Sequence, residues 1–383
     1  MSERVNERKL AQAIFCSFTR SVFIPVEPSY LPLLTPVFNQ KRHFLLSVTA
    51  ALAYTDYSYP TLMYETVNRR QFLQTAGLSA LAITAGADRL LARSWRETAG
   101  LAELSKKSGL KIAYSAITWG NTDAQTVQAI TDLAALGYRG IQLRANTFGS
   151  YRAKPSALKA LLDQNKLTLA MFSSGNVEID PAKEQSTIDM HVAHASFVKA
   201  LGGSAIQLTN SARPKDRLPT TEELKRLATV MNEIGRQTAD LGVQATYHNH
   251  MHQLGETPEE VDVIVQAMNP KFMKLELDIA HYKQGGGQPE KAVKQYKDII
   301  YALHLKDTMS PLPDKPGDPK AYKFVELGRG NVDVPAVFRA LDDISFKGWG
   351  IIELDGVPET DKTAAQCAQI NKDYITKTLK FPL

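Results

Sequence analysis

The chain has 383 residues, of which 44% are hydrophobic and 22% charged, and its formal charge is +5. It is therefore long enough to bury a substantial core. Residues 93–383 hold 36 Lys or Arg against 34 Asp or Glu, a balance of +2 that disfavours nucleic acid as a partner. These residues contain no apolar run of 18 or more, so we expect no membrane span in them.

Residues 63–92 resemble a twin-arginine export signal. The stretch Asn68-Arg69-Arg70-Gln71-Phe72-Leu73-Gln74 is close to the consensus, and a run of apolar and small residues follows over 76–85. Cleavage sites are offered at 85–87 or 90–92. An amphipathic helix with an incidental arginine pair is the alternative. We therefore expect residues 93–383 to be the mature, periplasmic protein, with Cys367 as its one cysteine and no intramolecular disulfide.

Met63 lies five residues before Asn68, where the start of such a signal belongs. Residues 1–62 mix aromatic residues and prolines without a clear period. We interpret them as a non-native or disordered extension that results from a start codon assigned too far upstream. A genuine extension that shields the signal is the alternative. The fold is therefore expected in residues 93–383 alone.

From Lys111 onward, short apolar runs alternate with segments of helical spacing. The expected strands are residues 112–115, 140–143, 167–172 and 205–208, followed by four that begin near 245, 275, 302 and 350. The expected helices are residues 122–136, 156–164, 185–201, 221–241, 258–268, 289–296, 334–341 and 363–376. Eight such units in about 270 residues predict an α/β fold, a single-domain (β/α)8 TIM barrel. A doubly wound open sheet is the alternative, disfavoured because no Gly-rich nucleotide loop follows the first strand.

Three finer expectations concern helices and a loop. Thr221 is expected to cap the helix 221–241. His191 and His194 stand at i and i+3 on the helix 185–201, and we expect them at its surface. The long loop 308–323 follows the seventh strand on the presumed active-site face, where such loops tend to cover substrate.

Four residues that can bind a metal stand at the ends of the last four expected strands: His248, Asp278, His304 and Glu353. A single histidine at a strand end is more often a hydrogen-bonded structural residue than a ligand. Four such residues on successive strands are harder to explain by packing, because buried carboxylates without a partner are costly. Two imidazoles and two carboxylates suit Mn²⁺, Co²⁺, Zn²⁺ or Fe²⁺ better than Ca²⁺. We expect one divalent metal, with Mn²⁺ first and Mg²⁺ also considered.

Several motifs together resemble the xylose-isomerase-like TIM-barrel superfamily, over about residues 111–380. They are Tyr-His-Asn-His at 247–250, Asp-x-x-His at 278–281, His-x-Lys-Asp at 304–307, Glu-Leu-Gly-x-Gly at 326–330 and the final Ile-Glu at 352–353. The group includes sugar isomerases and epimerases and inosose dehydratase. The resemblance implies that His248, Asp278, His304 and Glu353 bind the metal. It also implies that His281 contacts substrate beside the metal.

The sequence departs from the pattern of keto-sugar epimerases at two positions. These enzymes usually have a glutamate where His248 stands, and that glutamate forms an acid/base pair with the last one. Many members also have a glutamate at the end of strand two, where this chain has Gln142. Both changes weaken a mechanism with two glutamates, and His-Asn-His is more similar to inosose dehydratase.

Enolisation is the chemistry that we expect. A metal that binds a carbonyl and a neighbouring hydroxyl acidifies the C–H between them. His250, His281 and Glu353 are the candidate bases, and Lys306 is the candidate proton donor. The main hypothesis is an isomerase or epimerase that acts on a keto-sugar through an enediolate.

Other outcomes stay open. The alternative hypothesis is a hydro-lyase, either a dehydratase or a hydratase, that acts on a keto-sugar or inosose. A non-catalytic sugar-binding barrel is less favoured, and a nuclease lacks spare ligands and positive charge. Export favours a non-phosphorylated substrate, since sugar phosphates are scarce outside the cytoplasm. Barrels of this group often associate, so a homo-oligomer is a further expectation.

Overall fold

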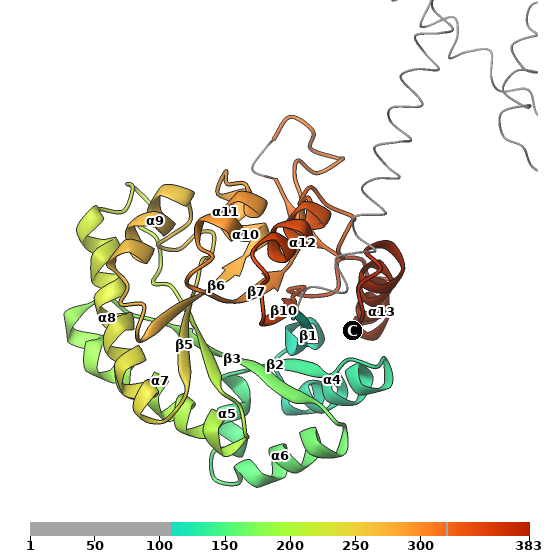
Figure 1. The fold of residues 1–383 in the computed structure, drawn as a ribbon, viewed down its shortest axis with the longest axis horizontal. Coiled ribbons are helices and arrows are strands. Elements are labelled where there is room, and N and C mark those ends of the chain that lie inside the picture. Colours follow the sequence, from blue (N-terminus) through green and yellow to red (C-terminus); the bar gives the residue numbers. More distant parts are fainter. Residues whose placement is uncertain (1–108, 319–320) are drawn as a thin grey trace, which may run out of the picture. The chain divides into compact units, whose positions relative to one another are not determined.

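The computed structural model describes residues 109–318 and 321–383. The expected extension and signal in residues 1–92 therefore lie outside the described residues. Eight parallel strands form a closed barrel that helices surround (Figure 1). Each strand pairs with the next along the chain, and the last pairs with the first, which confirms the (β/α)8 barrel. The strands are β1 (Lys111–Ser115), β2 (Gly140–Arg144), β3 (Thr168–Asn176), β4 (Ala205–Thr209), β5 (Gln244–His248), β6 (Met273–Asp278), β7 (Ile300–Leu305) and β10 (Trp349–Ile352).

The outer helices begin at favourable residues. Thr122, Thr220 and Thr363 each form a capping box with the residue three positions on. The expected cap Thr221 is therefore wrong by one residue, because Thr220 pairs reciprocally with Glu223. The helices are α4 (Asp123–Ala135), α5 (Asn146–Tyr151), α6 (Pro155–Gln164), α7 (Glu184–Ala200), α8 (Thr221–Asp240), α9 (Pro258–Ala267), α10 (Ile279–Gln284), α11 (Pro289–Gln295), α12 (Val334–Asp343) and α13 (Ala364–Asp373).

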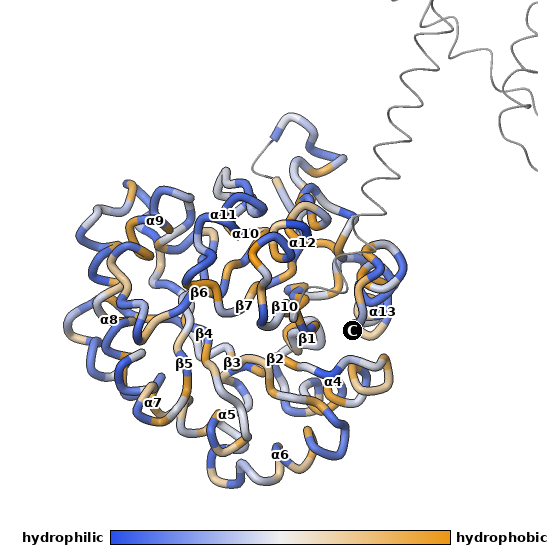
Figure 2. The backbone as a smooth tube through the Cα atoms, viewed as in Figure 1, coloured by the Kyte–Doolittle hydropathy of each residue, from blue (hydrophilic) through white to orange (hydrophobic). Residues whose placement is uncertain are grey.

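Alternation along the strands divides the interior into two parts. Every second strand residue faces outward, where residues such as Ile206, Leu275 and Leu303 pack in the main core with the helices. In Figure 2 the surrounding helices carry both hydrophobic and hydrophilic residues. The inward positions hold a small apolar layer that includes Ala113, Ala302 and Ile351. They also hold buried polar side chains, namely Gln142, Gln207, Thr246, Glu276 and His304.

The expected loop 308–323 lies within a hairpin. After β7 the chain forms β8 (Asp307–Met309) and returns as β9 (Lys323–Val325), and these two strands pair antiparallel. Strand β9 places the ring of Phe324 against the ring of His281, with ring centres 5.2 Å apart. The hairpin therefore contributes an aromatic side chain beside the strand ends of the barrel.

Two further expectations concern membranes and cysteines. Among the described residues, no helix has the length and apolar character needed to cross a membrane. Cys367 is a free and buried cysteine, while Cys16 lies outside the described residues.

His191 and His194 are buried, so the expectation that they lie on the surface of their helix is wrong. Helix α7 packs them against β3, where Ser174 Oγ lies 2.6 Å from His191 Nδ1 and 2.8 Å from His194 Nδ1. His194 Nδ1 donates to the Ser174 carbonyl at 3.1 Å, and His191 Nε2 donates to the Asn176 carbonyl at 3.2 Å. The Ser174 hydroxyl therefore donates to His191 Nδ1, and both imidazoles are neutral.

Replacement of His191 by Gln should reduce the acid sensitivity of the fold. Burial lowers the pKa of His191 to about 4, whereas the unfolded imidazole takes up a proton near pH 6.5. Its stabilising contribution is complete above pH 6.5 and is lost as the pH falls to 4, a change of about 3 kcal/mol. Urea unfolding at pH 7.0 and 4.5 should show a larger loss for the wild type than for His191→Gln. Equal losses in the two proteins would contradict the assignment of a neutral, buried His191.

Candidate functional site

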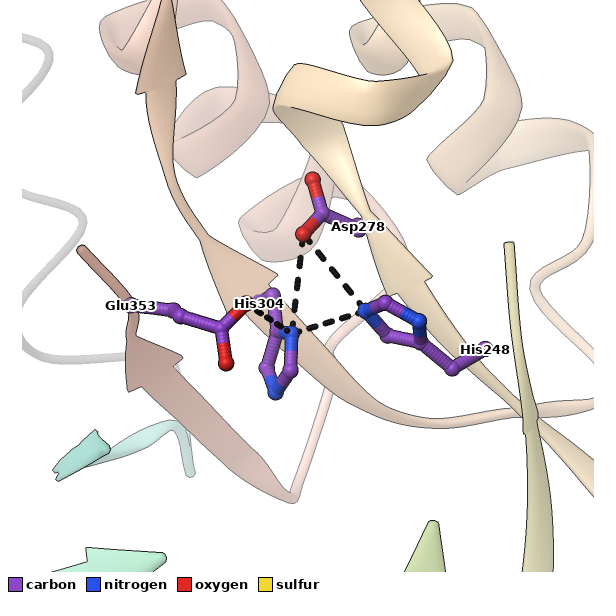
Figure 3. A group of neighbouring side chains, drawn as sticks. All are labelled: His248, Asp278, His304 and Glu353. Atoms are coloured by element: carbon purple, nitrogen blue, oxygen red, sulfur yellow. Dashed lines mark hydrogen bonds and ion pairs between the residues drawn. The ribbon is translucent and has the colours of Figure 1, made fainter. Parts of the chain in front are cut away.

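The four expected metal ligands converge at the carboxyl ends of their strands. His248 ends β5, Asp278 ends β6, His304 lies in β7 and Glu353 follows β10 (Figure 3). One ligand atom from each lies within 4.8 Å of every other, and all four side chains are buried. His304 Nδ1 is 2.9 Å from His248 Nε2 and 3.1 Å from Glu353 Oε2. The arrangement brings two imidazole nitrogens and two carboxylate oxygens to one point.

Local hydrogen bonds aim the Asp278 carboxylate. Its Oδ1 accepts the backbone N–H groups of Ala280 and His281, both at 2.8 Å, at the start of α10. The backbone of Asp278 is in turn held by the Asn249 side chain, which donates to its carbonyl and accepts from its N–H. These contacts leave Oδ2 facing the cluster, 3.5 Å from His248 Nε2.

The cluster fits a divalent metal ion. Asp278 Oδ2 has no hydrogen-bond partner among the described residues, although it is buried. Burial alone would raise the pKa of Glu353, but His304 and Lys306 outweigh it and hold that pKa well below its usual value. Two ionised carboxylates with little access to water call for a cation. Mixed nitrogen and oxygen donors are typical of first-row divalent ions.

Behind His304 lies a second set of polar side chains. His304 Nε2 is 3.0 Å from Gln142 Oε1 and 3.3 Å from Glu276 Oε1. The Gln142 amide donates to Gln207 Oε1 at 2.8 Å. Burial lowers the pKa of His304, but the charges of Glu353 and Glu276 outweigh it and raise that pKa well above its usual value. Sequence reasoning missed Glu276, although it lies between two outward leucines and so faces inward.

Lys306 is fully buried beside the cluster. Its Nζ lies 3.0 Å from Glu353 Oε2, 2.9 Å from Asp355 Oδ1 and 3.2 Å from His281 Nε2. The same ammonium lies over the ring of Phe324, 4.2 Å from its centre. Burial opposes a charged lysine, but Glu353 and Asp355 raise the pKa of Lys306 above its usual value. Asp355 is the second residue that sequence reasoning missed.

His250 and His281 form a close, tilted pair of rings next to the cluster, with ring centres 3.9 Å apart. Nδ1 of His250 donates to the Met251 carbonyl at 2.7 Å, which leaves Nε2 as the acceptor. Burial lowers the pKa of His250 to about 4 and holds that of His281 well below its usual value. Both imidazoles are therefore neutral near pH 7, and each can accept a proton.

Asp307, the last residue of the His-x-Lys-Asp motif, has a structural place. Its carboxylate accepts four backbone N–H groups at 2.9–3.0 Å, those of Thr308, Gly328, Gly330 and Val332. A Cβ atom at Gly330 would lie 2.3 Å from Asp307 Oδ1. The Glu-Leu-Gly-x-Gly motif therefore folds around Asp307 and supports the end of β7.

Comparisons with known proteins show two similar enzymes. The inosose dehydratase of Klebsiella pneumoniae (strain 342) is 28% identical over 302 residues, which cover 71% of this chain and 98% of that protein. The inosose dehydratase of Lacticaseibacillus casei (strain BL23) is 24% identical over 303 residues, with 72% and 98% covered.

Two solved structures are similar in fold. The IolI protein with a bound zinc atom has a TM-score of 0.58 at 19% identity, with 70% of this chain and 98% of that chain covered. The probable 3-DHS dehydratase AsbF of Bacillus anthracis has a TM-score of 0.56 at 17% identity, with the same two shares. Residues 130–372, well over half of the sequence, match the family described as "Xylose isomerase-like TIM barrel". The chain therefore belongs to the xylose isomerase-like TIM barrel family.

Proposed function

We propose that this enzyme is a metal-dependent hydro-lyase that removes water from a non-phosphorylated keto-cyclitol or keto-sugar, with an inosose as the first substrate to test. The observation that carries the proposal is the placement of one buried ammonium, Lys306, and two neutral imidazoles beside the same four-residue cluster. The inosose dehydratase relatives, which match over 98% of their length, support the hydro-lyase over the isomerase that the sequence favours.

The proposed metal ligands are His248 Nε2, Asp278 Oδ2, His304 Nδ1 and Glu353 Oε2, the atoms that converge. We propose Mn²⁺ as the ion, with Co²⁺, Zn²⁺, Fe²⁺ and Mg²⁺ as the others to compare. When bound, the ion supplies Lewis acidity that stabilises the negative charge on a substrate carbonyl oxygen.

The residues around the cluster have separate roles in this proposal. His250 Nε2 accepts the proton from the carbon beside the carbonyl, because its other nitrogen is committed to Met251. His281 packs against the ring of His250 and holds it in place. Lys306 donates a proton to the hydroxyl on the next carbon. That C–O bond breaks as the C=C bond forms, and the hydroxyl leaves as water.

The substrate test uses the protein with Mn²⁺ and an inosose in D₂O, followed by proton NMR and mass spectrometry. The proposal predicts loss of an α-proton signal and a product lighter by one water. Exchange of the α-proton with a new isomer, and no water loss, would instead select the isomerase or epimerase. No change with any inosose or ketose, while metal is bound, would favour the sugar-binding barrel.

Export is the second part of the proposal. We propose that residues 63–92 are a twin-arginine signal, that residues 1–62 are not needed for it, and that residues 93–383 act in the periplasm. The order of Arg69-Arg70, Phe72-Leu73 and the run of apolar and small residues supports this. A periplasmic location also supports a substrate without phosphate.

Replacement of Arg69 and Arg70 by Lys should retain the protein in the cytoplasm of a bacterial host. The measurement is cell fractionation of the full chain followed by immunoblotting. Arg89→Lys, a matched change in the same segment but outside the motif, should leave export intact. Export of the double variant at the wild-type level would remove the twin-arginine assignment.

Addition of Mn²⁺ should raise the melting temperature of the protein, because the ion compensates the buried carboxylates. At one hundred times the dissociation constant, the gain in unfolding free energy is about 3 kcal/mol. Asp278→Asn should abolish the rise, whereas Asp163→Asn on the exposed face of α6 should keep it. Differential scanning calorimetry in chelator and in Mn²⁺ makes the comparison. A wild type that does not respond to any of the five ions would argue against the site.

Lys306→Met should lower kcat by about 10²- to 10⁴-fold, because methionine fills the volume but donates no proton. Lys323→Met, which removes a β9 lysine paired with Glu359, is the matched control and should retain kcat. Steady-state kinetics with the substrate found above gives both values. A Lys306→Met enzyme within about tenfold of the wild type would exclude the lysine as the acid.

A further inference from the structure

Glu276 is a buried acid that the proposed reaction does not use. It lies in the middle of β6, its exposure is 0%, and neither carboxylate oxygen has a hydrogen-bond partner among the described residues. The neighbouring hydroxyl of Thr246 donates to the Ile206 carbonyl at 3.0 Å. A carboxyl group left this way is costly unless another group compensates it.

Among the described residues, Glu276 lies within ion-pair distance of His304 Nε2. Oε1 of Glu276 lies 3.3 Å from Nε2 of His304, the ring nitrogen that faces away from the metal cluster. The same nitrogen lies 3.0 Å from Gln142 Oε1. Because the Gln142 amide donates to Gln207, its oxygen is the atom turned toward His304. His304 Nε2 therefore faces two acceptors and carries the ring proton.

This arrangement fixes the tautomer of His304. With the proton on Nε2, the lone pair is on Nδ1, the nitrogen that points at His248, Asp278 and Glu353. A carboxylate behind a metal-binding imidazole fixes the ring and raises its basicity as a ligand. An amide oxygen accepts the same proton but carries no charge, so it is the weaker partner.

We propose that Glu276 is a positioning residue that supplies, from β6, the negative charge behind His304 that a glutamate at position 142 would supply from β2. The two positions reach the same nitrogen from different strands, so one carboxylate is enough. This inference rests on the proposed metal site and adds to it the residue that tunes one ligand.

The test measures Mn²⁺ affinity by electron paramagnetic resonance of the free ion, for the wild type and three variants. Glu276→Gln should weaken Mn²⁺ binding by about 10- to 100-fold. The double variant Gln142→Glu/Glu276→Gln should recover most of that loss, since it returns a carboxylate to the same nitrogen. Gln207→Glu/Glu276→Gln is the matched control, because residue 207 contacts Gln142 and not His304, and it should not recover.

The outcomes separate this inference from the metal site itself. A wild type that binds neither Mn²⁺ nor any of the other four ions would argue against both the metal site and the role of Glu276. A wild type that binds Mn²⁺ while Glu276→Gln binds within about threefold of it would remove the role of Glu276 alone. A loss that Gln142→Glu does not recover, or that Gln207→Glu recovers equally, would show that Glu276 acts by packing. If Glu276→Gln does not fold, Glu276→Asp replaces it, with the same recovery expected from Gln142→Glu.

The absorption spectrum of the Co²⁺-loaded protein gives a second readout that does not depend on turnover. The visible bands should shift in Glu276→Gln and return toward the wild type in Gln142→Glu/Glu276→Gln, because they report the donor strength of His304. Unchanged bands in Glu276→Gln would overturn the proposal.

Discussion

Buried negative charge at the carboxyl end of the barrel is the constraint on which the site depends. Asp278 and Glu353 are ionised although they are almost closed to water. Such burial costs several kcal/mol, roughly, unless positive charge compensates it. Lys306 provides one positive charge, at 3.0 Å from Glu353. When the two converging imidazole nitrogens carry no proton, one negative charge is left uncompensated, and a divalent ion would supply the missing positive charge.

Strand geometry arranges the inward-facing polar side chains in layers along the barrel. Inward positions recur at every second residue, so a strand that offers a metal ligand offers an inward neighbour two residues away. On β6 that neighbour is Glu276, which lies below the cluster near His304. Lys306 stands two residues after His304, and Asp355 stands two after Glu353, and these two meet at 2.9 Å. Residues two positions apart in a short motif therefore lie at successive levels of the barrel, where each contacts residues from other strands.

The same alternation explains what the sequence can predict. Apolar runs and helical spacing predict the barrel, and polar strand ends predict the group that contains His248 and Glu353. Glu276 and Asp355 each lie two residues from an expected ligand, so the alternation could have predicted that they face inward. The sequence does not show which side chain on another strand each of them contacts. His191 is the clearer failure, because a polar residue on a helix looks exposed until Ser174 of β3 is placed against it. The cap was decided by Glu223, three residues after Thr220.

The choice between water loss and epimerisation depends on which groups stand around one carbon. The resemblance drawn from the sequence implies that keto-sugar epimerases use two glutamates as an acid/base pair. This chain has His248 at one of those positions, and its Nε2 faces the metal cluster. Water loss needs only one base and, on the next carbon, an acid. His250 has an acceptor nitrogen for the first role, and Lys306 has an ammonium for the second. The histidine at position 248 therefore supports the proposed dehydration, since the base and the acid that this proposal assigns do not include residue 248.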